Sequence, residues 1–175
     1  GFLSQSDWPK LTNAAGKLSE APIFIDDTAG LSVLELRAKA RRLKSQHDIR
    51  LIIVDYLQLM SPNQKSDNET VRMKNLSREL KLMAISEEVP IMAISSATPD
   101  DVTKLDTVPT LGQTAWSRQI AYDADWVMAL GRAVNSDVIE CVFRKNRNGF
   151  MGDFMIQVDF DKGYYRYKDF EDKNA

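Results

Sequence analysis

The stretch Leu51-Ile52-Ile53-Val54-Asp55-Tyr56-Leu57-Gln58-Leu59-Met60 decides the fold of this chain. Four apolar residues lead directly into the carboxylate of Asp55. A continuous run of this kind is typical of a strand that is covered on both faces, which favours a parallel sheet. Because ligands of open α/β sheets collect at the carboxyl ends of the strands, Asp55 is a candidate for holding a nucleotide-bound Mg²⁺. The alternative is an Asp that only closes a strand and opens a turn.

The surrounding sequence alternates predicted strands and helices. A short helix begins near Asp7, and Ile23-Phe24-Ile25 is predicted to be a strand. Ser32 and Glu35 form a capping box that opens a helix over about 33–46, and a second helix over about 68–87 leads to a buried strand at 89–94. The second helix is expected to bury five residues: Val71, Leu76, Leu80, Met83 and Ala84. Strand, helix, strand, helix, strand is the pattern of a parallel α/β domain.

The last third of the chain changes to an antiparallel pattern. A strand over 126–130 is followed by predicted strands over 138–143, 153–160 and 164–167. Asn148-Gly149 and Lys162-Gly163 supply the turn residues between them. We therefore expect a mostly parallel sheet flanked by helices, with an antiparallel extension at its end.

Composition is that of a globular piece, and residues 1–175 are interpreted as the C-terminal portion of a single domain. The chain has 175 residues, 43% of them hydrophobic and 27% charged. A net charge of −2 gives no overall attraction to nucleic acid, so DNA contacts would need local basic patches. A single cysteine excludes an internal disulfide, and no apolar run is long enough to span a membrane. These features predict a cytoplasmic protein with no membrane partner.

Three ordered segments resemble the replicative hexameric helicases of the DnaB family. The first runs from Ala21 through the helix that ends near Lys44, the second is the Asp55 strand, and the third is Phe143-Arg144-Lys145-Asn146-Arg147-Asn148-Gly149. The resemblance covers about residues 6–167. It implies the carboxyl-terminal part of a RecA-like ATPase domain that uses ATP and Mg²⁺, with the Asp55 strand as its Walker B strand.

A RecA-like ATPase also needs a phosphate loop of the form G-x-x-x-x-G-K-[ST], and this sequence has no such run. The resemblance implies that Gly1 corresponds to a point beyond that loop and beyond the first strand. Family topology places the missing strand between the strands at Ile91 and Trp126, so two hydrogen-bonding edges should face a gap. The isolated chain is accordingly expected to bind ATP weakly and not to hydrolyse it.

The same resemblance assigns roles to individual residues. Asp55 would bind Mg²⁺ through water, and Gln58 and Ser95 would lie at the nucleotide. Lys145 and Arg147 alternate with Asn146, so both side chains leave one face of the strand. In the family these two cations act in trans, as an arginine finger and its partner at the neighbouring subunit's ATP. Ring assembly from identical subunits follows, and a basic hairpin rim is the alternative.

Single-stranded DNA is the implied polymer ligand. Lys65 and Arg72 would contact its phosphates, although a solvated loop and helix face would explain them equally well. The loop over 97–110 is too acidic for that role. Ser96 departs from the family, which usually places a Gln there to sense the γ-phosphate, and Thr98 or Gln113 are candidate substitutes. Primase and a helicase loader are further partners that the family implies.

Two other interpretations of the sequence remain open. Lys145-Asn146-Arg147 followed by Asn148-Gly149 also resembles the RadA recombination ATPases, although the Asp55 strand favours the helicase. A non-catalytic partner or remnant that keeps only the surface for pairing with a helicase subunit is the more distant alternative.

Overall fold

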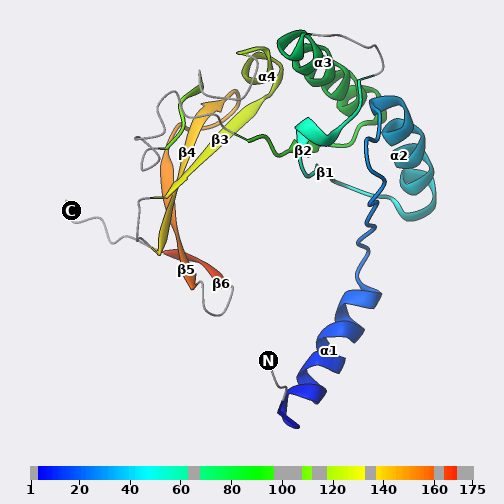
Figure 1. The fold of residues 1–175 in the computed structure, drawn as a ribbon, viewed down its shortest axis with the longest axis vertical. Helices are drawn as coiled ribbons and strands as arrows, with labels where there is room; N and C mark the ends of the chain where they lie inside the picture. The colour runs from blue at the N-terminus through cyan, green and yellow to red at the C-terminus, as the bar shows by residue number, and fades with distance from the viewer. Residues whose placement is uncertain are drawn as a thin grey trace, which may run out of the picture.

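The computed structural model describes residues 4–62, 68–96, 108–111, 118–132, 137–159 and 164–168 (Figure 1). The N-terminal elements are α1 (Asp7–Glu20), α2 (Val33–His47), β1 (Ile52–Val54), the 3₁₀ turn η1 (Leu57–Leu59), α3 (Glu69–Glu87) and β2 (Ile91–Ala93). The C-terminal elements are α4 (Arg118–Asp123), β3 (Trp126–Arg132), β4 (Val138–Asn146), β5 (Asp153–Asp159) and β6 (Tyr164–Lys168). Apart from the segment at 23–25, each predicted helix and strand is present within a few residues of its expected bounds.

The described strands form two separate sheets. β1 and β2 pair in parallel, with Val54 opposite Ala93, whereas β3, β4, β5 and β6 form an antiparallel meander in sequence order. Within the described residues, β2 pairs only with β1 and β3 pairs only with β4. The expected break between the strands at Ile91 and Trp126 is therefore present.

The core lies where α2 and α3 cover β1 and β2. Its buried residues are Val33, Ala40, Ile52, Val54, Leu57, Met60, Met73, Leu76, Leu80, Met83 and Val89. Leu76, Leu80 and Met83 of α3 are buried as predicted, but Val71 is 42% exposed and Met73 takes the core position in the first turns of the helix. The predicted burial of Val71 was wrong because α3 turns a different side of its N-terminal turns toward β1.

β1 is covered on one face only. Ile52 and Val54 are buried, but the intervening Ile53 is 58% exposed, which contradicts the expected coverage of both faces. Both neighbouring helices of the core pack on the Ile52 side, so the alternating side chain of Ile53 points away from them. The continuous apolar run thus marks a strand with a second apolar face that no described element covers.

The segment that contains Ile23, Phe24 and Ile25 is extended but is not a strand. Its predicted pairing was wrong because, among the described residues, no strand lies in register to accept its backbone hydrogen bonds; Ile25 is 90% exposed. It links α1, which buries no residue, to α2, and Figure 1 shows α1 projecting from the body of the molecule.

Side chains cap the first turns of α2 and α3, and the cap of α2 is the one predicted from sequence. Ser32 and Glu35 form the capping box of α2, in which the Ser32 hydroxyl accepts from the Glu35 amide. Asn68 caps α3 through the amides of Thr70 and Val71. None of the described helices has the length and apolar character needed to cross a membrane.

Candidate nucleotide site and finger hairpin

Asp55 lies at the carboxyl end of β1, with its side chain exposed to solvent. Within the described part of the chain, no hydrogen bond or ion pair engages its carboxylate. The bond between Asp55 and Tyr56 is a cis peptide. The backbone continues into η1, where the amide of Leu57 donates to the carbonyl of Ile94 at 2.8 Å. The ends of β1 and β2 are thereby held together beside a carboxylate that is free to bind a cation.

Gln58 and Ser95 meet at this edge. The Gln58 Nε2 atom donates to Ser95 Oγ at 3.1 Å, which joins the turn after β1 to the residue after β2. Gln58 Oε1 is buried and has no hydrogen-bond partner among the described residues. A buried acceptor of this kind is normally satisfied, and a water bound to a metal ion would donate the hydrogen bond that it lacks. Carboxylate and amide oxygens are suitable neighbours for hydrated Mg²⁺, so these residues fit that ion.

Arg72 has a structural role in the described molecule. Its guanidinium donates to the carbonyl of Met60 at 2.6 Å and to that of Gln58 at 3.1 Å, and it pairs with Glu69. Its side chain is only 19% exposed. These contacts speak against the predicted contact with DNA phosphates, because a guanidinium that satisfies two backbone carbonyls would have to abandon them. Arg72 instead fixes the turn after Asp55 to α3.

Other predicted residues of this edge lie outside the described residues. Lys65, the second candidate for DNA binding, is one of them, as are Thr98 and Gln113. Ser96 is described and is exposed; its carbonyl accepts from Ser95 Oγ at 3.3 Å. A serine side chain at this position is shorter than the Gln expected there.

Lys145 lies near the end of β4 and caps α4. Its ammonium donates to the carbonyls of Ala121 at 2.8 Å and Tyr122 at 3.0 Å, where the helix leaves carbonyls without intrahelical partners. Burial, followed by the charge of Arg147, lowers the pKa of Lys145. The ammonium is thus ordered by helix carbonyls.

Arg147 follows β4 directly and is about half exposed. Its Nη1 atom donates to Asp125 Oδ1 at 3.0 Å, and its backbone amide donates to the Asp125 carbonyl at 2.9 Å. The other carboxylate oxygen of Asp125 accepts from the Lys81 ammonium of α3. A hydrogen bond from Lys81, together with the charges of Lys81, Arg147 and Lys145, lowers the pKa of Asp125. Both predicted cations therefore reach residues 121–125.

The loop between β4 and β5 is longer than a two-residue Asn-Gly turn. It spans 147–152, and Asn146 Nδ2 donates to the carbonyl of Phe150 at 2.9 Å across it. A Cβ atom on Gly149 would lie 2.5 Å from Asn146 Nδ2, so glycine allows this close approach. The side chain of Phe150 is 95% exposed at the tip.

Sequence reasoning missed Asp125 and Lys81. Asp125 stands immediately before a predicted strand, as Asp55 stands immediately after one, but only the antiparallel register of β3 and β4 places it opposite Arg147. This register could not be predicted from the sequence, because a bulge at Arg144 shifts the pairing between Val127–Lys145 and Met128–Phe143.

No described contact joins the two groups of candidate residues. The described contacts of Lys145 and Arg147 are with residues 121–125, and none is with Asp55, Gln58 or Ser95. Asp55 follows β1 of the parallel sheet, whereas the two cations lie at the end of β4 in the antiparallel sheet.

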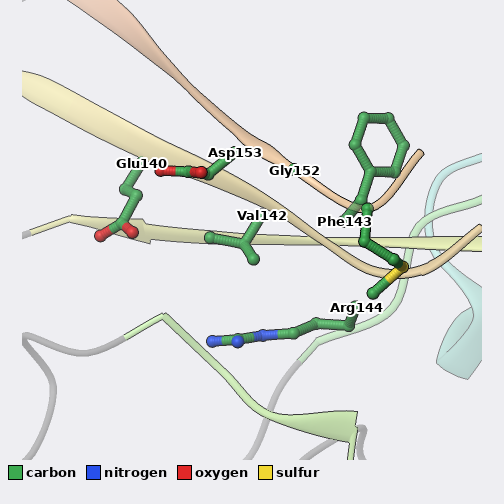
Figure 2. Close-up of a pocket in the computed structure, with 7 residues that line it drawn as sticks. Glu140, Val142, Phe143, Arg144, Gly152 and Asp153 are labelled. Carbon is green, nitrogen blue, oxygen red and sulfur yellow. The ribbon is translucent and has the colours of Figure 1, made fainter. Parts of the chain in front are cut away.

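A pocket of about 520 Å³ opens on the sheet of β4 and β5 (Figure 2). It is lined by Glu140, Val142, Phe143, Arg144, Met151, Gly152 and Asp153. The Arg144 guanidinium donates to the carbonyls of Val108 at 3.0 Å and Pro109 at 2.9 Å. The lining thus holds one guanidinium and two carboxylates, those of Glu140 and Asp153. Because negative charge is in excess, this lining is poorly suited to a triphosphate.

A parallel strand that ends in a carboxylate, with a basic hairpin on a second sheet, is the arrangement that the resemblance predicted for a RecA-like ATPase domain. Residues 1–169 match the family model described as DnaB-like helicase C terminal domain, and the chain belongs to this family. It is similar to the replicative DNA helicase DnaC of Bacillus subtilis (37% identity, 98% of this chain) and to the replicative DNA helicase DnaB of Mycobacterium intracellulare (39% identity, 89% of this chain).

Solved structures agree with this assignment. One that is described as an ATPase domain matches 96% of this chain and 62% of its own, with a TM-score of 0.88 and 30% identity. A DnaB-like replicative helicase, solved in a study of its interactions with primase, matches 95% of this chain and 42% of its own, also with a TM-score of 0.88, at 29% identity. The chain spans 39% of the length of the Bacillus relative and 26% of that of the Mycobacterium relative.

Proposed function

We propose that this chain is the C-terminal part of the ATPase domain of a replicative, ring-forming DNA helicase of bacterial or phage origin, active in the cytoplasm. The protein would couple ATP hydrolysis to movement along single-stranded DNA and to duplex unwinding. The observation that carries the proposal is the placement of Asp55 and of Lys145 with Arg147 on separate sheets, because this is the arrangement that one subunit needs to serve two ATP sites.

At its own site, each subunit would use Asp55, Gln58 and Ser95. Mg²⁺, when bound with ATP, neutralises charge on the β- and γ-phosphates. Asp55 would hold the ion through water, and the buried Gln58 Oε1 would accept a hydrogen bond from such a water. Ser95 would keep the Gln58 amide in place through the 3.1 Å hydrogen bond.

At the neighbouring subunit's site, Arg147 would meet the phosphates directly. Lys145 would add its positive charge without leaving the carbonyls of Ala121 and Tyr122 that its ammonium caps. An arginine finger stabilises charge on the transferred phosphoryl group and is typically worth about 10³–10⁵ in rate. Arg147 suits this role because it is half exposed and Asp125 engages one of its nitrogens, which leaves other donors available. A trans role requires a ring of identical subunits.

Partners follow from the same proposal. Single-stranded DNA would pass through the ring, with Lys65 as the candidate phosphate contact of this chain. Arg72 is left out because its guanidinium is committed to backbone carbonyls. Primase is a proposed partner because a similar helicase was solved in a study of its interactions with primase, and a loader is a further proposal.

The decisive experiment is complementation in mixed rings. The protein that carries this chain is prepared with Asp55→Asn, which removes its own metal carboxylate, and with Arg147→Ala, which removes the donated finger. Each variant alone should lose ATPase activity by about 10³-fold or more. Mixing them should restore a measurable fraction, since some interfaces then combine an intact Asp55 with an intact Arg147.

Three results of these assays would contradict the proposal. No recovery on mixing, with rings of normal mass by light scattering, would contradict the division of the two residues between subunits. Full activity of Arg147→Ala alone would favour a basic hairpin rim. Hydrolysis by the isolated 175-residue chain would contradict the requirement for a separate phosphate loop.

A further inference from the structure

The contacts of Arg147 single out Asp125, which precedes β3. This residue holds Arg147 twice, through its carbonyl to the backbone amide at 2.9 Å and through its carboxylate to the guanidinium at 3.0 Å. The first bond fixes where the residue leaves the sheet, and the second fixes where its side chain points. The bond to the guanidinium restricts the rotamers of the Arg147 side chain before it meets a phosphate. Less side-chain entropy is then lost when the phosphate binds.

Asp125 is itself anchored. Its second carboxylate oxygen accepts from Lys81, whose side chain is 27% exposed and belongs to α3. One turn earlier, Ser77 Oγ donates to Asp123 at 3.0 Å. α3 therefore ties down the whole junction between α4 and β3, so the carboxylate that Arg147 meets is fixed to the core.

Charge is not cancelled by this arrangement. Lys81, Lys145 and Arg147 contribute three positive charges against the two negative charges of Asp123 and Asp125, so the cluster stays cationic. Only Nη1 of Arg147 is engaged by the carboxylate, and the planar fork retains donors at its other nitrogens. The geometry suits a carboxylate that orients a guanidinium while leaving it able to bind an anion.

We propose that Asp125, anchored by Lys81, is a positioning residue that presents Arg147 to the phosphates of the neighbouring subunit's nucleotide. The proposal rests on the trans role of Arg147 proposed above. Asp125 touches no substrate; it acts by reducing the number of orientations that Arg147 must give up when the transition state forms.

The test uses the protein that carries this chain, with Asp125→Ala, Arg147→Ala and the double variant compared in steady-state ATPase assays. Asp125→Ala should lower kcat by about 10–100-fold and change KM for ATP less than about twofold, because positioning acts in the transition state. The double variant should be no slower than Arg147→Ala alone, since Asp125 acts only through Arg147.

Asp153→Ala is the matched control, because this carboxylate is exposed on β5 of the same sheet and its removal should leave kcat unchanged. Asp125→Asn keeps the side-chain shape and one acceptor oxygen, so it should lose less activity than Asp125→Ala. It should still lose some, because it cannot offer a separate oxygen to each of the two cations. It decides the question if the alanine variant fails to fold or to form rings.

The outcomes separate the two proposals. An unchanged kcat in Asp125→Asn and in any folded Asp125→Ala, with a large loss in Arg147→Ala, would overturn the positioning role and leave the finger intact. A double variant much slower than Arg147→Ala would also overturn it. No loss in Arg147→Ala would overturn the finger itself.

Discussion

At the scale of single residues, Glu87 shows how the chain accommodates a buried charge. Its side chain is 7% exposed and accepts from Arg37 at 2.6 Å and Arg41 at 2.8 Å, which joins the end of α3 to α2. The hydrogen bonds from Arg41 and Arg37 lower the pKa of Glu87 from 4.5 to about 2. The carboxylate is thus more acidic in the folded chain than in the unfolded chain.

Glu87→Gln should lower the free energy of unfolding at neutral pH by about 1–3 kcal/mol, because two guanidinium groups lose a charged acceptor. Since the folded pKa is the lower one, the stabilisation is complete above about pH 4.5 and is lost as pH falls toward 2. Urea unfolding at several pH values measures this. Glu88→Gln is the control, because that side chain is 87% exposed. An equal loss in both variants would contradict a specific role for Glu87.

At the scale of elements, β1 shows that the residues of one continuous apolar run can alternate between the buried core and the exposed surface. Ile52 and Val54 face α2 and α3 in the core, whereas Ile53 faces away from them. Sequence correctly predicted the strand, and with it the exposed Asp55 at its carboxyl end. The two faces of the strand differ only because the helices pack on one of them.

Ile52→Ala and Ile53→Ala form a matched pair on this strand. The first should cost about 2–4 kcal/mol of stability through loss of buried surface and a residual cavity. The second should cost less than about 1 kcal/mol, because the side chain is already 58% exposed. Thermal unfolding of both variants measures the difference. Equal losses would mean that the Ile53 face is covered in solution.

At the scale of the whole molecule, large apolar side chains remain exposed on separate elements. Trp8 and Leu18 of α1 are 60% and 66% exposed, Ile25 is 90% exposed, and α1 buries no residue. Among the described strands, β2 and β3 each have one edge without a partner strand. Exposed apolar side chains and unpaired strand edges are surfaces on which another chain segment packs.

The 175-residue chain should consequently associate as its concentration rises, which light scattering detects as an increasing mass. Trp8→Ser with Leu18→Ser should weaken this association and leave the melting temperature nearly unchanged, since α1 contributes nothing to the described core. Leu76→Ser, in that core, should instead unfold the chain. A monomer at all concentrations would contradict the expectation.

The sequence by itself determined the family, through the resemblance of three ordered segments. It also determined α1, α2 and α3, most of the strands and the carboxylate at the end of β1. These depend on short-range periodicity, capping residues and strand-end chemistry, all of which are local. Tertiary structure alone decided the rest. The segment at 23–25 is not a strand because it has no partner to pair with among the described residues, Arg72 turned inward because two carbonyls needed donors, and Asp125 met Arg147 because a bulged antiparallel register brought them together. Such outcomes depend on which distant groups become neighbours, and local patterns do not contain that information.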